Sequence, residues 1–490
     1  MFPARTSMSA IQDQKVSDAR EDSAAAFARF VCTTRFRDLP SDVIAIAKCA
    51  VLDTLGVALA ASGIGEGCNE VVAFAISQAG RAEAAIWSNG RRVCASMAAL
   101  ANGALARALD YDDLMDSPQA HVSVCTVPAA MAMAERRHQP VPGKELILAI
   151  AVGCEIQHRL ALAMVRGQDP AHFPVMLATQ IFGYFSAAAA AGRLLRLPPE
   201  RMQSAFGLAL MQAAGTEEMV VHSTSSMGKC IYAAFSNQGG VQAAMLADQG
   251  VPAVGGILDG TAGLFAAYYG RHYDRATLTE GLGRAYLSTA RCFKFWPGTL
   301  IAHPFIEAAL KLLARDRIRP GDIAAVRARV GVWGKTMSEP LADRKRPPTS
   351  AAAMNSLPFI LGKVLANGTV TLADFKGRLR SQPAALAMAD KFSYRYEPEH
   401  NNASGLETGM LEIATTDGRK HEIGIEPPRG HPQRALSFDE IAEKFARNVK
   451  YAAVVPDLRR VERMIESVRN IDKADDVRGL VATIVSRRRR

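Results

Sequence analysis

The chain has few aromatic side chains and no paired cysteine motif. Aromatic residues make up 7% of its 490 residues, whereas hydrophobic residues make up 49% and alanine is abundant. None of the eight cysteines belongs to a C-x-x-C pair, so zinc-knuckle and dithiol redox spacings are absent, and a reducing cytoplasm fits. Alanine-rich, aromatic-poor composition favours closely packed helices over sheets.

Long, strongly apolar runs are also missing. A membrane-spanning helix needs about 18 or more such residues in a row. The longest uncharged stretch, 173–192, is interrupted by Pro174 and Thr179, and the more apolar run 146–154 is short. We expect both to be buried helices of a soluble protein without a membrane partner. Residues 1–22 are polar and charged, which argues against a secretory signal and predicts a disordered tail.

Motifs for nucleotides, metals and nucleic acids are lacking as well. The glycine pairs at 239–240 and 255–256 do not stand in a G-x-G-x-x-G or GK[ST] context, and no H-E-x-x-H or Cys/His set occurs, so we expect no nucleotide cofactor and no metal. The net charge of +10 comes partly from the arginines at 487–490. Because the other charges are dispersed, we expect a solvated basic surface that favours anionic metabolites, not a nucleic-acid partner.

Hydrophobic periodicity divides the chain into two predicted domains. Residues 23–289 show almost only helical spacing. Residues 290–428 contain alternating segments at 323–332 and 408–415, and Asp417-Gly418 then provides a hairpin turn. Residues 429–490 are helical again. We therefore predict a mainly α protein, in which a smaller α+β lid is inserted before the C-terminal helices of a large helical domain, with a substrate cleft between them.

The most informative segment is ALDYDD at 108–113, followed by His121. Its three carboxylates and the histidine lie at the end of an alanine-rich helical run. Burial beside neighbouring charges can move carboxylate and imidazole pKa values toward neutrality, as acid/base chemistry requires. The alternatives are an aspartate-rich helix exit that caps nearby amides, or a loose divalent-cation site.

Two lysines are candidates for binding anions. Lys229 follows a small polar loop and precedes an apolar helix, so its ammonium group would lie near a helix N-terminus. Lys294 lies in CFKFWP, where aromatic neighbours would strengthen a lysine–carboxylate contact, and His303 follows it. His172 lies in a predicted loop before the helix that begins near Gln180.

Several blocks, in order, resemble the MmgE/PrpD family, which contains 2-methylcitrate dehydratase, cis-aconitate decarboxylase and iminodisuccinate epimerase. The resemblance covers about residues 23–449. The blocks are ANGALARALDYDD, HVS before VPAAMAMAE, SAAAAAGRLLRL, GKCIYAAFSNQGGVQAAMLADQG, ILDGTAGLFAAYYG, FKFWPGTLIAHP, NSLPFILGKVL and ALSFDEIAEKF.

The resemblance implies a helical domain with a lid, a homodimer, and catalysis without a metal or other cofactor. It also implies that Asp110, His121, Lys229 and Lys294 line the pocket. Asp113 and His303 are further candidates for substrate contact. The other candidates stand at positions where the chain departs from the family. The histidine of a family His-Pro-Thr motif falls near Leu177, five residues after His172; Phe359 replaces a tyrosine; and Thr299 and Tyr232 replace histidines.

These observations lead to one preferred function and three alternatives. We expect a cytoplasmic, cofactor-independent lyase of the dehydratase type that removes a proton alpha to a carboxylate of a small di- or tricarboxylic acid. In this hypothesis His121, oriented by Asp110, is the base or acid, and Lys229 and Lys294 stabilise the enolate-like charge. The alternatives are a dicarboxylate epimerase, a cis-aconitate-type decarboxylase, and a catalytically degenerate homologue that only binds acids.

Overall fold

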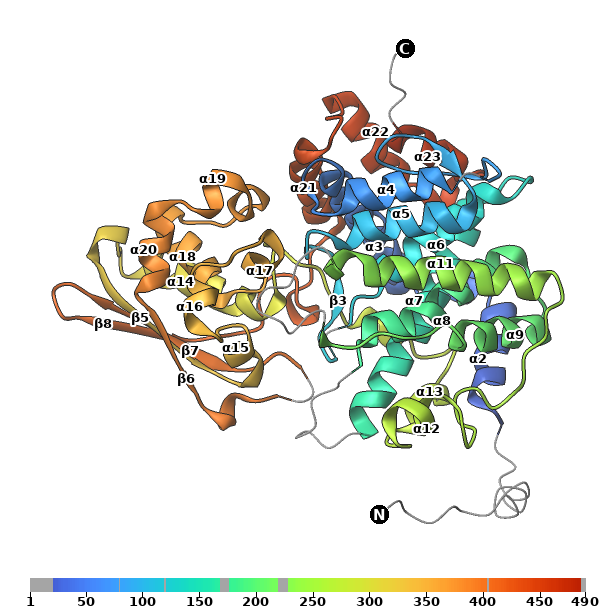
Figure 1. Ribbon diagram of the computed structural model, residues 1–490, viewed down its shortest axis with the longest axis horizontal. Coiled ribbons are helices and arrows are strands. Elements are labelled where there is room, and N and C mark those ends of the chain that lie inside the picture. The colour runs from blue at the N-terminus through green and yellow to red at the C-terminus, as the bar shows by residue number, and fades with distance from the viewer. Residues whose placement is uncertain are drawn as a thin grey trace.

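A computed structural model describes residues 21–78, 80–118, 120–167, 176–218, 228–402 and 405–485, with backbone only for 228–230. The predicted disordered tail lies almost entirely outside these residues. The fold is mainly α, as predicted, with a large helical domain and a smaller α+β domain (Figure 1).

The helical domain is a bundle of long helices that pack around a common apolar core. Its N-terminal part contains α2 (Ser23–Thr33), α3 (Ser41–Ile64), α4 (Cys68–Ser77), β1 (Ala84–Ala85), β2 (Arg92–Val93), α5 (Ala95–Arg107), β3 (Leu114–Met115), α6 (Ser123–Arg136), α7 (Gly143–Gly167), α8 (Ala178–Leu195), α9 (Pro199–Leu210), α11 (Gly228–Asp248), α12 (Leu264–Tyr269), α13 (Arg275–Thr279) and β4 (Arg291–Cys292). Its C-terminal part contains α21 (Phe438–Asn448), α22 (Leu458–Arg469) and α23 (Arg478–Ile484), and α21 packs against α3.

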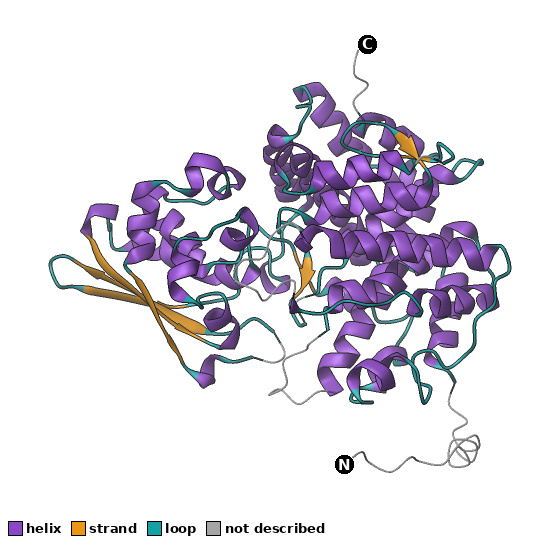
Figure 2. Ribbon diagram, in the orientation of Figure 1, coloured by secondary structure: helices purple, strands orange, loops and turns teal. Residues whose placement is uncertain are grey.

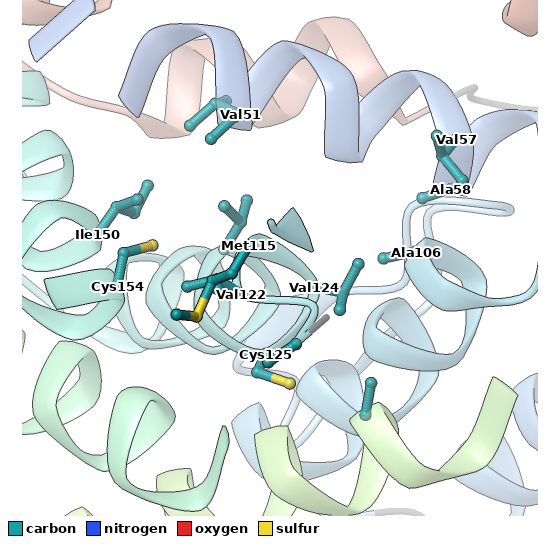
Figure 3. Close-up of a cluster of buried hydrophobic side chains, with 14 of the residues drawn as sticks. Val51, Val57, Ala58, Ala106, Met115, Val122, Val124, Cys125, Ile150 and Cys154 are labelled. Atoms are coloured by element: carbon teal, nitrogen blue, oxygen red, sulfur yellow. The ribbon is translucent and has the colours of Figure 1, made fainter. Parts of the chain in front are cut away.

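Two of these helices are apolar on nearly all sides and therefore lie inside the bundle. By length and composition, α3 and α7 are apolar enough to cross a membrane, but 78% and 94% of their most apolar windows are buried within the fold. This burial is typical of core helices. Figure 3 shows apolar side chains of both, with Val51 on α3 and Ile150 on α7, near Met115 of β3.

The smaller domain combines one sheet with several short helices. It contains α14 (His303–Arg315), β5 (Ile323–Val330), α15 (Val332–Thr336), α16 (Leu341–Lys345), α17 (Ser350–Met354), α18 (Leu357–Asn367), α19 (Gly377–Arg380), α20 (Pro383–Asp390), β6 (Phe392–Tyr396), β7 (Gly409–Thr415) and β8 (Lys420–Gly424). The strand order is β6-β5-β7-β8; β6 runs parallel to β5, and the other neighbours are antiparallel. Figure 2 shows this sheet at the edge of the molecule and β3 where the two domains meet.

Local signals explain most boundaries in this region. Buried and partly exposed residues alternate along β7, as the sequence predicts, and the turn at Asp417-Gly418 joins β7 to β8. Ser437 and Glu440 form the capping box that starts α21. Residues 350–367 form two helices, α17 and α18, because Ser356 caps a new helix start just before Pro358.

The closest helix pairing in the core depends on a glycine, so we predict that Gly240→Ala destabilises the protein. A Cβ at Gly240 would lie 2.4 Å from the Cβ of Ala187 and 2.8 Å from the carbonyl oxygen of Tyr184 on α8. Overpacking of this kind costs about 1–3 kcal/mol. Urea unfolding should show the loss, whereas Gly479→Ala, at a helical position with open space around it, should leave the protein as stable or slightly more stable. Equal stability of both variants would contradict this account of the α8–α11 packing.

Candidate active site

A cavity of about 110 Å³ lies between the helical domain and the lid. Its walls come from α5, α7, α8 and α11 on one side and from α15 and the end of α17 on the other. The lining residues are Arg107, Asp110, Leu114, Pro118, His121, Met164, Leu177, Ala178, Thr179, Glu217, Tyr232, Lys294, Thr299, Leu300, Ile301, Trp333, Met337 and Asn355. Charged and hydroxyl-bearing groups therefore share this space with apolar side chains, as in most small-molecule sites.

A short β-ladder brings the aspartate loop to the segment that contains Lys294. β3 pairs with β4 in antiparallel register, with Leu114 opposite Cys292 and Met115 opposite Arg291. Continuing this register places Lys294 opposite the loop at 110–112. Asp110 and Lys294, 184 residues apart in sequence, thus share one wall of the cavity.

Asp110 and Lys294 form a buried ion pair at this wall. The Lys294 Nζ lies 2.5 Å from Oδ1 of Asp110 and donates a 2.8 Å hydrogen bond to the carbonyl oxygen of the same residue. Asp110 has a φ of 47°, a left-handed conformation that costs energy in a residue other than glycine. The two bonds from Lys294 hold this strained backbone in place.

His121 faces Asp112, not Asp110 as the sequence suggested. Its Nδ1 lies 2.6 Å from Oδ2 of Asp112, so we assign the proton to Nδ1, which leaves Nε2 as the basic nitrogen. The backbone of His121 is held as well, because its N–H donates to Thr179 (2.9 Å) and its carbonyl oxygen accepts from Gln157 (2.8 Å).

Burial and a nearby cation keep the imidazole neutral. Desolvation, with the positive charge of Arg107, lowers the pKa of His121 to about 4, although Asp112 acts in the opposite direction. Burial alone would raise the pKa of Asp112, but Arg107 and His121 outweigh it and lower that pKa. At neutral pH the pair is therefore a carboxylate and a neutral imidazole, the state of a general base.

Arg107 connects the two aspartates with Tyr232. Its Nη1 lies 3.0 Å from Oδ1 of Asp110 and 3.0 Å from Oδ1 of Asp112, and its Nε donates to the Tyr232 hydroxyl oxygen. Burial, the largest effect, raises the pKa of Tyr232 above its usual range. Tyr232 thus keeps its proton and, since its oxygen accepts from Arg107, can donate that proton toward the cavity.

Two further ion pairs support the loop from outside the cavity. Arg291 lies 3.2 Å from Asp113, whose carboxylate also accepts from Ser123 (2.7 Å). Lys444, on α21, lies 2.7 Å from Asp53 and donates to the Tyr111 carbonyl oxygen at 2.7 Å. The sequence had suggested Asp113 as a substrate-binding residue, but in the structure its partners lie within the protein.

Of the remaining residues predicted from the sequence, only some line the cavity. Thr299 lines the cavity. His303 is fully buried against Trp296, with their ring centroids 5.6 Å apart, and Phe359 packs on Phe375; neither lines the cavity. Lys229 is the second residue of α11, but its side chain, like His172, lies outside the described part of the structure.

Neither of two clusters with metal-ligand spacing fits a metal ion. Ligand atoms of Asp110, Asp112 and His121 lie within 4.8 Å of one another, but Arg107 and Lys294 already neutralise both carboxylates and would repel a divalent cation. In the second cluster, Asp116, Cys292 and His431, the Nδ1 of His431 accepts from the Gln433 N–H (3.2 Å) and its Nε2 lies 3.0 Å from Asp116. This arrangement places a proton on Nε2, where a metal would need a lone pair.

The geometry defines a two-domain protein with a buried cluster of charged side chains at a cavity between its domains. Comparison with known proteins identifies the family. The MmgE/PrpD N-terminal domain matches residues 25–276, and the MmgE/PrpD C-terminal domain matches residues 296–470. The chain therefore belongs to the MmgE/PrpD family, as its sequence blocks indicated.

Relatives along nearly the whole chain include named decarboxylases. The cis-aconitate decarboxylase-like protein oryM of Aspergillus oryzae is 28% identical over 94% of this chain and 96% of its own length. The cis-aconitate decarboxylase of Aspergillus terreus is 25% identical over 95% and 96%, and that of Homo sapiens is 24% identical over 92% of each chain.

Sequence reasoning found Lys294 but missed the other three cations that hold the loop, Arg107, Arg291 and Lys444. Arg107 could have been found, because it stands three residues before Asp110 on a predicted helix, where side chains meet. Arg291 and Lys444 carry no such local signal. Arg291 is 178 residues from its partner Asp113, and Lys444 is further still from Asp53.

We predict that His121 titrates near pH 4 and not near its ordinary 6.5. NMR of the histidine-labelled protein should show a neutral imidazole at pH 5.5, with the signal assigned by its loss in His121→Gln. Between pH 4 and 6.5 the imidazole of residue 121 binds a proton in the unfolded chain but not in the folded protein. The free energy of unfolding should therefore rise over this range, by on the order of 3 kcal/mol from this residue. Above pH 6.5 this contribution should be complete. A midpoint near 6.5 would contradict the described burial.

Proposed function

We propose that this protein is a lyase that acts on a small di- or tricarboxylic acid, with His121 transferring the proton alpha to a substrate carboxylate. The observation that carries the proposal is the neutral imidazole paired with Asp112 in the cavity between the two domains. A buried carboxylate behind an imidazole fixes its tautomer and stabilises the imidazolium that forms when it takes a proton.

The two fixed cations of the site support an acidic substrate. The described cluster contains two cations, Arg107 and Lys294, two carboxylates, Asp110 and Asp112, and a neutral imidazole. When His121 takes the substrate's proton, the site gains one positive charge as the substrate gains the negative charge of an enolate. The fixed ammonium of Lys294 and guanidinium of Arg107 then stabilise this charge without reorganisation. Lys229 stays a prediction as a further cation for a second carboxylate.

Tyr232 is our candidate for the group that returns a proton. In elimination it would protonate the departing hydroxyl, so that a C–H and a C–O bond break and water leaves. In decarboxylation the C–C bond to a carboxylate breaks, carbon dioxide leaves with no oxidant, and the resulting carbanion takes a proton. Both routes need a protonated donor at the cavity wall, and the raised pKa of Tyr232 fits this role.

Three reactions therefore remain as candidates, with different support. The neutral imidazole favours removal of a substrate proton, which is the first step of dehydration and also of epimerisation. The names of the relatives favour decarboxylation, since cis-aconitate decarboxylases match more than nine-tenths of the chain. A homologue that binds acids without turnover would retain the cations but show no proton exchange.

The test of the proposal is proton NMR in deuterated water with 2-methylcitrate, citrate, cis-aconitate and iminodisuccinate. We expect the wild-type chain to convert or deuterate at least one acid, and the product distinguishes dehydration, decarboxylation and epimerisation. His121→Ala should lose at least about 10²-fold in rate, while His138→Ala, at an exposed histidine, should retain the wild-type rate. Near-normal turnover in a folded His121→Ala protein would refute the assignment.

We further predict that Tyr232→Phe lowers kcat by about 10²-fold while changing KM little, because the hydroxyl acts in proton return and not in binding. Steady-state kinetics on the acid identified above measures both constants. If deuterium exchange into the substrate continues while product formation falls, Tyr232 acts after proton removal. An unchanged kcat would remove Tyr232 from the mechanism.

A further inference from the structure

A second, larger cavity lies on the other side of the segments that form the active site. It has a volume of about 620 Å³, and its walls come from the loop after Asp110, the loop after Lys294, the lid at 369–372 and the end of α21. None of the roles proposed above uses it.

One wall of this cavity is aromatic. Tyr111, Phe295, Trp296 and Tyr451 line it, and the rings of Phe295 and Trp296 meet edge to face with centroids 4.9 Å apart. Flat rings of this kind favour planar apolar groups.

Cations stand at the same cavity with little to neutralise them. Arg447 is about half exposed, and its guanidinium lies 5.6 Å from the centroid of the Phe295 ring and 3.9 Å from the carboxylate of Glu443. Lys450 is exposed and has no ion pair within the part of the chain that the structure describes. The carboxylate of Asp374, near the lid wall of this cavity, accepts a hydrogen bond from Thr371 and pairs with Lys363. The cavity is therefore electropositive.

A buried amide in the wall lacks a partner. Asn448 is 2% exposed and lines the cavity, yet its Nδ2 has no hydrogen-bond partner among the described residues. A buried donor without an acceptor costs about 1–3 kcal/mol. An oxygen of a bound molecule would satisfy it.

We propose that this cavity binds an organic anion that carries a flat apolar group. The anionic group would bind Arg447 and Lys450, the amide of Asn448 would donate to it, and the planar part would lie against Phe295 and Trp296. The site is distinct from the acid/base cavity, because Asp110 and Lys294 line only the first cavity, while their neighbours Tyr111 and Phe295 line only the second.

A hydrogen bond links the two chain segments that lie between the cavities. The Tyr111 hydroxyl donates to the Phe295 carbonyl oxygen at 2.7 Å. A ligand against these rings would therefore contact the residues that directly follow Asp110 and Lys294. An effect of the ligand on turnover rests on the proposed function, but binding itself does not.

Calorimetric titration of the full chain with 2-naphthoate tests the proposal, with 2-naphthamide as the uncharged match. We expect binding of the carboxylate and at least about tenfold weaker binding of the amide. The double variant Arg447→Gln/Lys450→Gln should bind 2-naphthoate about tenfold or more weakly, as expected on losing charge-assisted hydrogen bonds. Arg459→Gln, at an exposed arginine of α22, should bind as the wild type does. No binding, or equal binding by the double variant, would overturn the proposal.

Tryptophan fluorescence locates the ligand. Trp296 lines the second cavity and Trp333 the first. 2-Naphthoate should quench the fluorescence of Trp333→Phe, which retains Trp296, and should quench that of Trp296→Phe far less. The reverse pattern would place the ligand in the acid/base cavity and contradict a second site, whatever the outcome of the turnover assays.

Discussion

The burial of charge in the loop at 110–113 is the constraint on which the rest of the structure depends. Three carboxylates lie there almost without solvent, and each unpaired charge would cost several kcal/mol. Cations from distant segments meet them: Arg107 from α5, Arg291 from β4, and Lys294 from the segment after β4. Removing one cation would strand a buried carboxylate, so the loop and the segments around it must fold together.

This network also fixes the chemistry of the cavity. Burial and the positive charges of Arg107 and Lys294 outweigh the attraction of Asp112, so the imidazole of His121 stays neutral. The guanidinium of Arg107 also donates to the Tyr232 oxygen, so the hydroxyl proton of Tyr232 can be donated toward the cavity. In the function we propose, His121 is the base and Tyr232 the proton donor, and one site performs both proton transfers.

The sequence predicted the mainly α class from its composition and helical spacing, and the strands β5, β7 and β8 from alternation and a turn dipeptide. It did not predict β6, whose exposed residues show no alternation, or the break between α17 and α18. At the site it brought together Asp110, His121 and Lys294 through a family resemblance. The partner of His121 could not be predicted. Asp110 and Asp112 are two residues apart, and the left-handed turn at Asp110 decides which of them faces the imidazole ring.

The most direct test of the account is deuterium exchange by Asp112→Asn, measured by proton NMR with whichever acid the wild-type chain deuterates in deuterated water. Thermal unfolding of the variant serves to show that it is folded. The account predicts that exchange falls at least about 10²-fold, because an amide neither fixes the His121 tautomer nor stabilises its protonated form. A folded Asp112→Asn protein that exchanges at the wild-type rate would contradict the central claim that this pair performs the proton transfer.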